Sequence, residues 1–155
     1  KILIICNKLE IPFVFKGSYR KANRSRIDSF TGIGDEEALS ILKKVGEQFN
    51  IPTITDVHSA EEAAIASRYV DVLQIPAFLC RQTDLIVAAA STGKWVNIKR
   101  SQSTSGQQAN TMIEKCWVGD NYNVQMIERG SSVLNDIVID WRNVIDMMEF
   151  DCNLN

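Results

Sequence analysis

Hydrophobic residues along this chain gather in short continuous runs that are separated by longer amphipathic segments. Strands covered on both faces, as in a parallel sheet, have nearly continuous apolar sequences rather than alternating ones. The runs therefore predict strands of a parallel sheet, and each of the main ones ends in polar residues. They cover residues 11–15, 51–55, 70–75, 95–99 and 123–127, and a shorter run at 136–140 predicts a further strand.

Helical periodicity fills the segments between these runs. The clearest helix follows Gly34, where Asp35 is the expected N-cap and acidic residues suit the positive end of the helix dipole. Leu39, Leu42, Val45 and Phe49 form its apolar stripe. Further helices are expected at 2–9, from Ser59 to about Ser67, over 81–90, from Ser105 or Gly106 past Cys116, and over 144–150.

The alternation of strands and helices predicts the α/β class. The 155 residues are enough for a single domain, residues 1–155, with its own core. On the pattern alone, a doubly wound sheet and a (β/α)8 barrel both remain open. No glycine-rich dinucleotide fingerprint follows the first strand, and Gly93-Lys94 lacks the rest of a P-loop.

Composition and charge indicate which kinds of binding partner this chain is expected to have. The net charge is −2, which argues against a nucleic-acid-binding domain and leaves small anionic ligands as the better fit. No apolar run approaches the length of a membrane span, so no membrane partner and no signal peptide are expected. The cysteines are widely spaced, which predicts reduced thiols, no metal site and a cytoplasmic protein. They are Cys6, Cys80, Cys116 and Cys152.

Cationic and polar residues follow the carboxyl ends of the predicted strands. Parallel α/β folds bind ligands at these ends, so the residues predict a pocket for two or more anionic groups. The alternatives are solvated strand ends and pairing of Arg129 with Glu128 or Asp136. The first strand leads into a basic loop, residues 16–26, which contains Lys16, Arg20, Lys21, Arg24 and Arg26. The later strand ends add Asp56, His58, Gln74, Arg81, Lys99, Arg100, Gln102 and Arg129.

Several of these stretches resemble one enzyme family. Lys16-Gly17-Ser18 with Lys21-Ala22-Asn23-Arg24-Ser25, the run from Asp71 to Leu85, and Glu128-Arg129-Gly130 are similar to 3-deoxy-D-manno-octulosonate 8-phosphate synthase, also called 2-dehydro-3-deoxyphosphooctonate aldolase. The resemblance covers nearly the whole chain in the right order. It implies a (β/α)8 TIM barrel that condenses phosphoenolpyruvate with arabinose 5-phosphate in lipopolysaccharide biosynthesis. It also implies a homotetramer when the chain is full length.

The resemblance also implies residue roles. Lys21, Lys99 and Arg129 would bind phosphoenolpyruvate, and Lys16 would transfer a proton at the reacting centre. Asp56 would orient the pentose hydroxyls. The resemblance places Asn23, Arg24 and Ser25 at the pentose phosphate and Gln74, Ala77, Phe78, Arg81 and Gln102 along the pocket.

The departures from the family are equally specific. This chain is expected to be a partial barrel that lacks the first strand and the last strands. The family's histidine and its metal ligands would lie outside it, so no cofactor is expected within this chain, and a divalent metal would belong only to a full-length, metal-dependent member. Arg20 stands where an acidic residue is usual, and the loop over residues 131–135 is shortened. Since unpaired sheet edges destabilise a barrel, we expect the 155 residues alone to be inactive and poorly stable.

Overall fold

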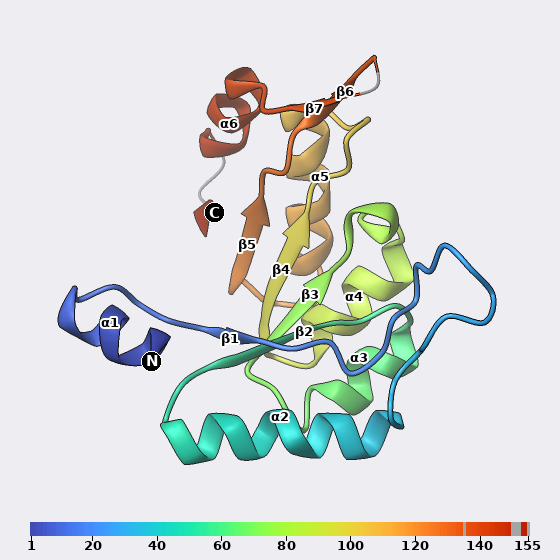
Figure 1. Cartoon of the computed structure of the whole chain (residues 1–155). Helices are drawn as coiled ribbons and strands as arrows, with labels where there is room; N and C mark the ends of the chain where they lie inside the picture. Colours follow the sequence, from blue (N-terminus) through green and yellow to red (C-terminus); the bar gives the residue numbers. More distant parts are fainter. Residues whose placement is uncertain (135, 150–152, 155) are drawn as a thin grey trace.

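One parallel sheet organises the computed structural model, which describes residues 1–134, 136–149 and 153–154. Its spatial order follows the chain, so each strand pairs with the next strand of the sheet, as in part of a (β/α)8 barrel (Figure 1). The predicted α/β class and partial barrel are therefore confirmed. The strands are β1 (Phe15–Lys16), β2 (Thr53–Asp56), β3 (Val72–Ile75), β4 (Trp95–Lys99), β5 (Val124–Ile127) and β8 (Asn153–Leu154).

Two of these strands differ from the sequence prediction. β1 pairs over Phe15 and Lys16 only, because residues 11–14 approach the sheet without a strand partner. β8 was not predicted, and it pairs in parallel with β5. The sheet thus continues one strand beyond the five that the apolar runs predicted.

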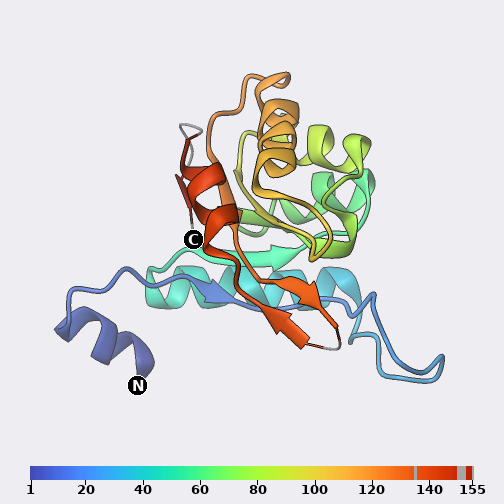
Figure 2. The ribbon, with the colours of Figure 1, turned by 90° about the horizontal axis from the view of Figure 1, so that it is seen from above.

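Helices connect successive strands, and α3, α4 and α5 cover the same face of the sheet (Figures 1 and 2). α1 stands apart from that layer at the amino terminus, and none of its residues is buried. A short 3-10 helix, η1 (Ala77–Leu79), precedes α4. The α-helices are α1 (Ile2–Lys8), α2 (Asp35–Phe49), α3 (Ala60–Ala66), α4 (Thr83–Ser91), α5 (Gly106–Trp117) and α6 (Trp141–Met148).

Local capping explains where several helices begin. Ser59 accepts a hydrogen bond from the Glu62 amide at 3.2 Å, and Ser105 forms a capping box with Gln108. Both predicted starts are confirmed. The predicted helix after Gly34 is confirmed as α2, but its predicted N-cap was wrong: Gly34, with a positive φ of 113°, is the N-cap and Asp35 is the first helical residue.

The carboxyl-terminal part folds differently from the predicted pattern. The run at 136–140 contains β7 (Asp136–Val138), which pairs antiparallel with β6 (Ser131–Val133) as a separate hairpin outside the main sheet. α6 begins at Trp141, three residues before the predicted start, since Asp140 caps it by accepting the Arg142 amide. The predicted end at Phe150, the loop position Asn135 and Cys152 lie outside the described residues.

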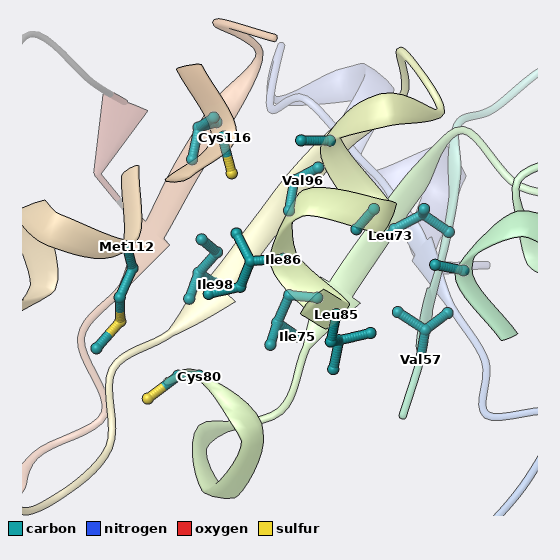
Figure 3. Close-up of a cluster of buried hydrophobic side chains, with 14 of the residues drawn as sticks. Val57, Leu73, Ile75, Cys80, Leu85, Ile86, Val96, Ile98, Met112 and Cys116 are labelled. Carbon is teal, nitrogen blue, oxygen red and sulfur yellow. The ribbon is translucent and has the colours of Figure 1, made fainter. Parts of the chain in front are cut away.

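The apolar side chains of the strands face the covering helices and form the core (Figure 3). Leu73, Ile75, Val96 and Ile98 are fully buried against this layer. Full burial of one such side chain contributes about 1.5–3 kcal/mol. Ile86, Met112, Ile113 and Cys116 are among the helix residues that complete the cluster.

The opposite face of the sheet carries a polar row. Asp56 is in register with Gln74, Gln74 with Asn97, and Asn97 with Gln125, so these side chains share one face across β2 to β5. This face is the one that a barrel encloses. The polar residues at the carboxyl ends of the strands gather at one end of this face.

The structure also bears on the predictions about membrane spans and cysteine thiols. Within the described residues, no helix is both long and apolar enough to cross a bilayer. Cys6, Cys80 and Cys116 are free thiols, and burial raises the pKa of Cys116 to about 12, so this thiol is held protonated.

Candidate functional site

Asp56, at the carboxyl end of β2, is the centre of a charged cluster that three strands supply. Its carboxylate lies 3.0 Å from Lys16 Nζ of β1 and 3.8 Å from Lys99 Nζ of β4. The side-chain amide of Gln74, on β3, donates to the same carboxylate at 2.5 Å. The sequence argument that Gln74 needs a polar partner is thereby confirmed.

The close charges shift the acidity of the cluster. Burial by itself would raise the pKa of Asp56, but Gln74, Lys16 and Lys99 outweigh it and hold that pKa below its usual range. Burial lowers the pKa of Lys99, and the positive charges of Lys16 and Arg129 lower it further, although Asp56 opposes this. Lys99 therefore sits among like charges in a partly dry site, where an added anion would be stabilised.

A pocket of about 180 Å³ opens beside this cluster. Cations from three segments line it: Arg20 and Lys21 of the basic loop, Lys99 of β4, and Arg129 after β5. Such a set suits phosphate or carboxylate groups. The other lining residues are Ser18, Ala22, Asn23, Asp56, His58, Pro76, Ala77 and Phe78.

A second hollow of about 840 Å³ adjoins the pocket and shares Asn23, Ala77, Phe78 and Arg129 with it. Arg81 and Gln102 lie on this second hollow, together with Ser101 and Ser103. The structure thus brings all but two of the predicted site residues to one region. A further hollow of about 890 Å³ lies at the opposite, amino-terminal ends of the strands, away from the cations of the site.

The two exceptions are Arg24 and Ser25; Lys16 and Gln74 also line neither hollow, but both contact Asp56, which lines the pocket. The Arg24 guanidinium instead donates to the backbone carbonyls of Ile27 and Ser29, both at 3.0 Å. Arg26 pairs with Asp28 at 2.6 Å. In this conformation the tip of the basic loop is closed on itself, and only its base faces the pocket.

Arg100 and Glu128 form a buried ion pair directly behind the pocket cations. The Arg100 side chain is 0% exposed and donates from Nε and Nη2 to the two carboxylate oxygens of Glu128, both at 2.6 Å. It also donates to the carbonyls of Ser101 and Thr104. Because Arg100 follows Lys99 and Glu128 precedes Arg129, the pair fixes the backbone of both pocket cations.

This pair corrects two readings of the sequence. Arg100 is not a cation at the pocket, and Glu128 pairs with Arg100 rather than with Arg129. Neither outcome was foreseen, since the two side chains are 28 residues apart along the chain. The one available signal was an acid directly before Arg129 and a second cation directly after Lys99.

The pair also predicts how stability depends on pH. Burial alone would raise the pKa of Glu128, but hydrogen bonds from Arg100 and the Gly130 amide hold it below its ordinary 4.5. A depressed folded-state pKa gives stability that is complete above pH 4.5 and is lost as pH falls through the folded value. Urea unfolding should therefore show a falling free energy below pH 4.5, with a shallower fall in Glu128→Gln. If the free energy of unfolding fell equally steeply with pH in that variant, Glu128 would not be the group responsible.

Comparison with known proteins agrees with this geometry. Residues 2–153 match the model of the DAHP synthetase I family. The chain is 48% identical over 144 residues to the 2-dehydro-3-deoxyphosphooctonate aldolase of Trichlorobacter lovleyi, covering 92% of this chain and 53% of that protein. The corresponding aldolase of Koribacter versatilis is 48% identical over 147 residues, covering 94% of this chain and 53% of the relative.

A plant relative shows the same extent of match. The 2-dehydro-3-deoxyphosphooctonate aldolase 2 of Arabidopsis thaliana is 46% identical over 149 residues, covering 96% of this chain and 51% of that protein. The chain thus spans about half the length of the curated relatives it matches. The resemblance drawn from the sequence motifs is confirmed, and with nearly every residue matched by the family model, the chain belongs to the DAHP synthetase I family.

Proposed function

We propose that this chain carries the phosphoenolpyruvate side of a 3-deoxy-D-manno-octulosonate 8-phosphate synthase. The observation that supports this most is the convergence of Lys21, Lys99 and Arg129 on one pocket beside Asp56, whose carboxylate Lys16 also contacts. Phosphoenolpyruvate has a phosphate and a carboxylate close together, so it requires several cations in a small, partly dry space.

In the proposed reaction, carbon 3 of phosphoenolpyruvate attacks the aldehyde carbon of arabinose 5-phosphate. Water adds at carbon 2, and the tetrahedral intermediate then loses inorganic phosphate. Lys21, Lys99 and Arg129 would bind the phosphate and carboxylate of phosphoenolpyruvate, and Gln74 would hold Asp56 in place. Holding both substrates together is itself a large part of the rate enhancement in such a condensation.

Lys16 is the proposed proton-transfer residue. Its Nζ lies 3.0 Å from Asp56 and its side chain is 40% exposed, so it can exchange protons with solvent and reach the reacting centre. Asp56 would accept hydrogen bonds from the pentose hydroxyls. The pentose phosphate would lie toward Asn23, Arg81 and Gln102 on the adjoining hollow, where Arg24 and Ser25 could join it only after the loop tip opens.

The remaining features of the family are proposed for a longer protein. Among the described residues, no group of three or more His, Cys, Asp or Glu lies close enough to hold a metal ion, so no step here goes through one. A homotetramer in the cytoplasm that works on phosphorylated small molecules is the assembly we infer. The alternative is a barrel that binds anions without turning over substrates.

Thermal-shift titration tests the proposal. Phosphoenolpyruvate at about a hundredfold excess over Kd should stabilise the protein by about 2.7 kcal/mol. Lys99→Ala should weaken the affinity at least about tenfold, because it removes a charged contact to the ligand, and so should cut the stabilisation at the same concentration to about 1.4 kcal/mol or less. Lys44→Ala, an exposed lysine of α2 outside the pocket, should respond like wild type.

The titration also separates the two functions. Because the 155 residues alone are expected to be inactive, phosphate release is measured on a longer protein that contains this chain and the remaining strands. Stabilisation by phosphoenolpyruvate, with phosphate release from that longer protein in the presence of arabinose 5-phosphate, would support the synthase. Stabilisation without release from the longer protein would support the anion-binding alternative. No response to either ligand would contradict the proposal.

A further inference from the structure

The carboxylate of Glu62, in the first turn of α3, receives donors from two separate parts of the site. Tyr19 Oη and Arg20 Nη1, in the basic loop, donate to it at 2.5 and 2.8 Å. The backbone amide and ring Nδ1 of His58, just after β2, lie 3.0 and 2.8 Å from it. The Glu62 side chain is only 14% exposed, so these contacts are shielded from water.

The basic-loop contacts to Glu62 come from within the segment that lines the pocket, residues 18–23. Tyr19 and Arg20 precede Lys21, and Lys21 and Asn23 both line the pocket. Arg20 also reaches Asp35 of α2, with Nη2 to Oδ2 at 2.5 Å, so its guanidinium joins two helix starts to the loop. The amide of Lys21 closes the base of this segment by donating to the Thr31 carbonyl at 2.8 Å.

The His58 contacts lie on the other wall of the same pocket. The His58 ring lines the pocket and stacks against Phe78, with ring centroids 6.5 Å apart and planes 21° apart. Glu62 thus fixes the ring from behind through Nδ1 and leaves Phe78 on its face. A single carboxylate holds both walls in their relative positions.

We propose that Glu62 is a positioning residue of the anion site, which ties the basic loop to the end of β2 and so presets Lys21 and Asn23 for the ligand. The inference rests on the proposed function for the identity of that ligand. It also accounts for Arg20, at a position expected to be acidic: its guanidinium lies at the edge of the pocket and is paired with Glu62 and Asp35.

Limited trypsin digestion tests the anchoring without any ligand. The peptide bonds after Lys21, Arg24 and Arg26 lie in exposed parts of the basic loop, and none is altered by substitution at Glu62. Glu62→Ala should raise cleavage there about tenfold, because local opening limits the rate. Cleavage after Lys43 and Lys44 in α2 should stay unchanged, which separates loop release from general unfolding.

Calorimetric titration with phosphoenolpyruvate supplies the second measurement. Glu62→Gln and Glu62→Ala should weaken binding about tenfold, equivalent to 1.4 kcal/mol, because the loop must then be ordered on binding. Glu61→Gln is the matched control: it removes the same charge from the same helical turn, but its side chain is exposed. It should match wild type in both assays.

The outcomes distinguish the two proposals. If wild type does not bind phosphoenolpyruvate but Glu62→Ala speeds loop cleavage, the proposed function fails and the anchoring stands. Wild-type loop cleavage in Glu62→Ala would overturn the anchoring, and wild-type affinity in both Glu62 variants would overturn the positioning role. Faster cleavage at Lys43 and Lys44 in equal measure would show a general structural role and also overturn it.

Discussion

Replacement of Arg100 by Met is expected to lower the free energy of unfolding by about 3–5 kcal/mol. Glu128 is only 6% exposed on its side chain, so it would be left as a buried carboxylate that keeps the Gly130 amide as a donor but has lost its counter-ion. The carbonyls of Ser101 and Thr104 would lose their donor as well. Since domains are only marginally stable, this loss is a large part of the total. Urea denaturation followed by circular dichroism measures it.

Arg142→Met provides the control for loss of a surface ion pair. Arg142 pairs with Asp140 at 2.7 Å, but its side chain is 86% exposed, so its removal should leave the unfolding midpoint unchanged. The double variant Arg100→Met, Glu128→Leu should be more stable than Arg100→Met, because it removes the stranded charge. Equal unfolding midpoints for Arg100→Met and Arg142→Met would show that the buried pair does not contribute to stability.

The contrast between Lys99 and Arg100 shows what the sequence could predict. The apolar runs located the strands, and the rule that ligands bind at carboxyl ends brought Lys16, Asp56, Lys99 and Arg129 together correctly. Adjacent side chains at a strand end point to opposite faces, however. The pattern could therefore not tell which cation meets the pocket and which is buried against a distant acid.

The basic loop shows a second limit. Its charge was visible in the sequence, but its partners are set by tertiary contacts: Arg24 meets carbonyls of its own loop, and Arg20 meets Glu62, 42 residues away. The β6–β7 hairpin was missed for a similar reason. Ser131, in β6, is held by Arg100 and Asn143, from other segments, rather than by any local pattern.

Replacement of Asp56 by Asn is expected to change the affinities for the two proposed substrates in opposite directions. The Asp56 carboxylate forms ion pairs with Lys16 and Lys99, at 3.0 and 3.8 Å. Charges about 4 Å apart interact by about 4 kcal/mol at an effective dielectric constant near 20. Without that competitor, the cations should bind phosphoenolpyruvate about tenfold more tightly, which corresponds to only part of this interaction.

Arabinose 5-phosphate should bind about tenfold more weakly to the same variant, since a neutral amide is a poorer acceptor for its hydroxyls than a carboxylate. Calorimetric titration of each ligand at fixed ionic strength would then show a roughly hundredfold change in their affinity ratio. Asp84→Asn, an exposed acid of α4, controls for net charge and should leave that ratio unchanged. If both affinities fell together in Asp56→Asn, Asp56 would only support the pocket structurally; opposite changes would place its carboxylate at the pentose.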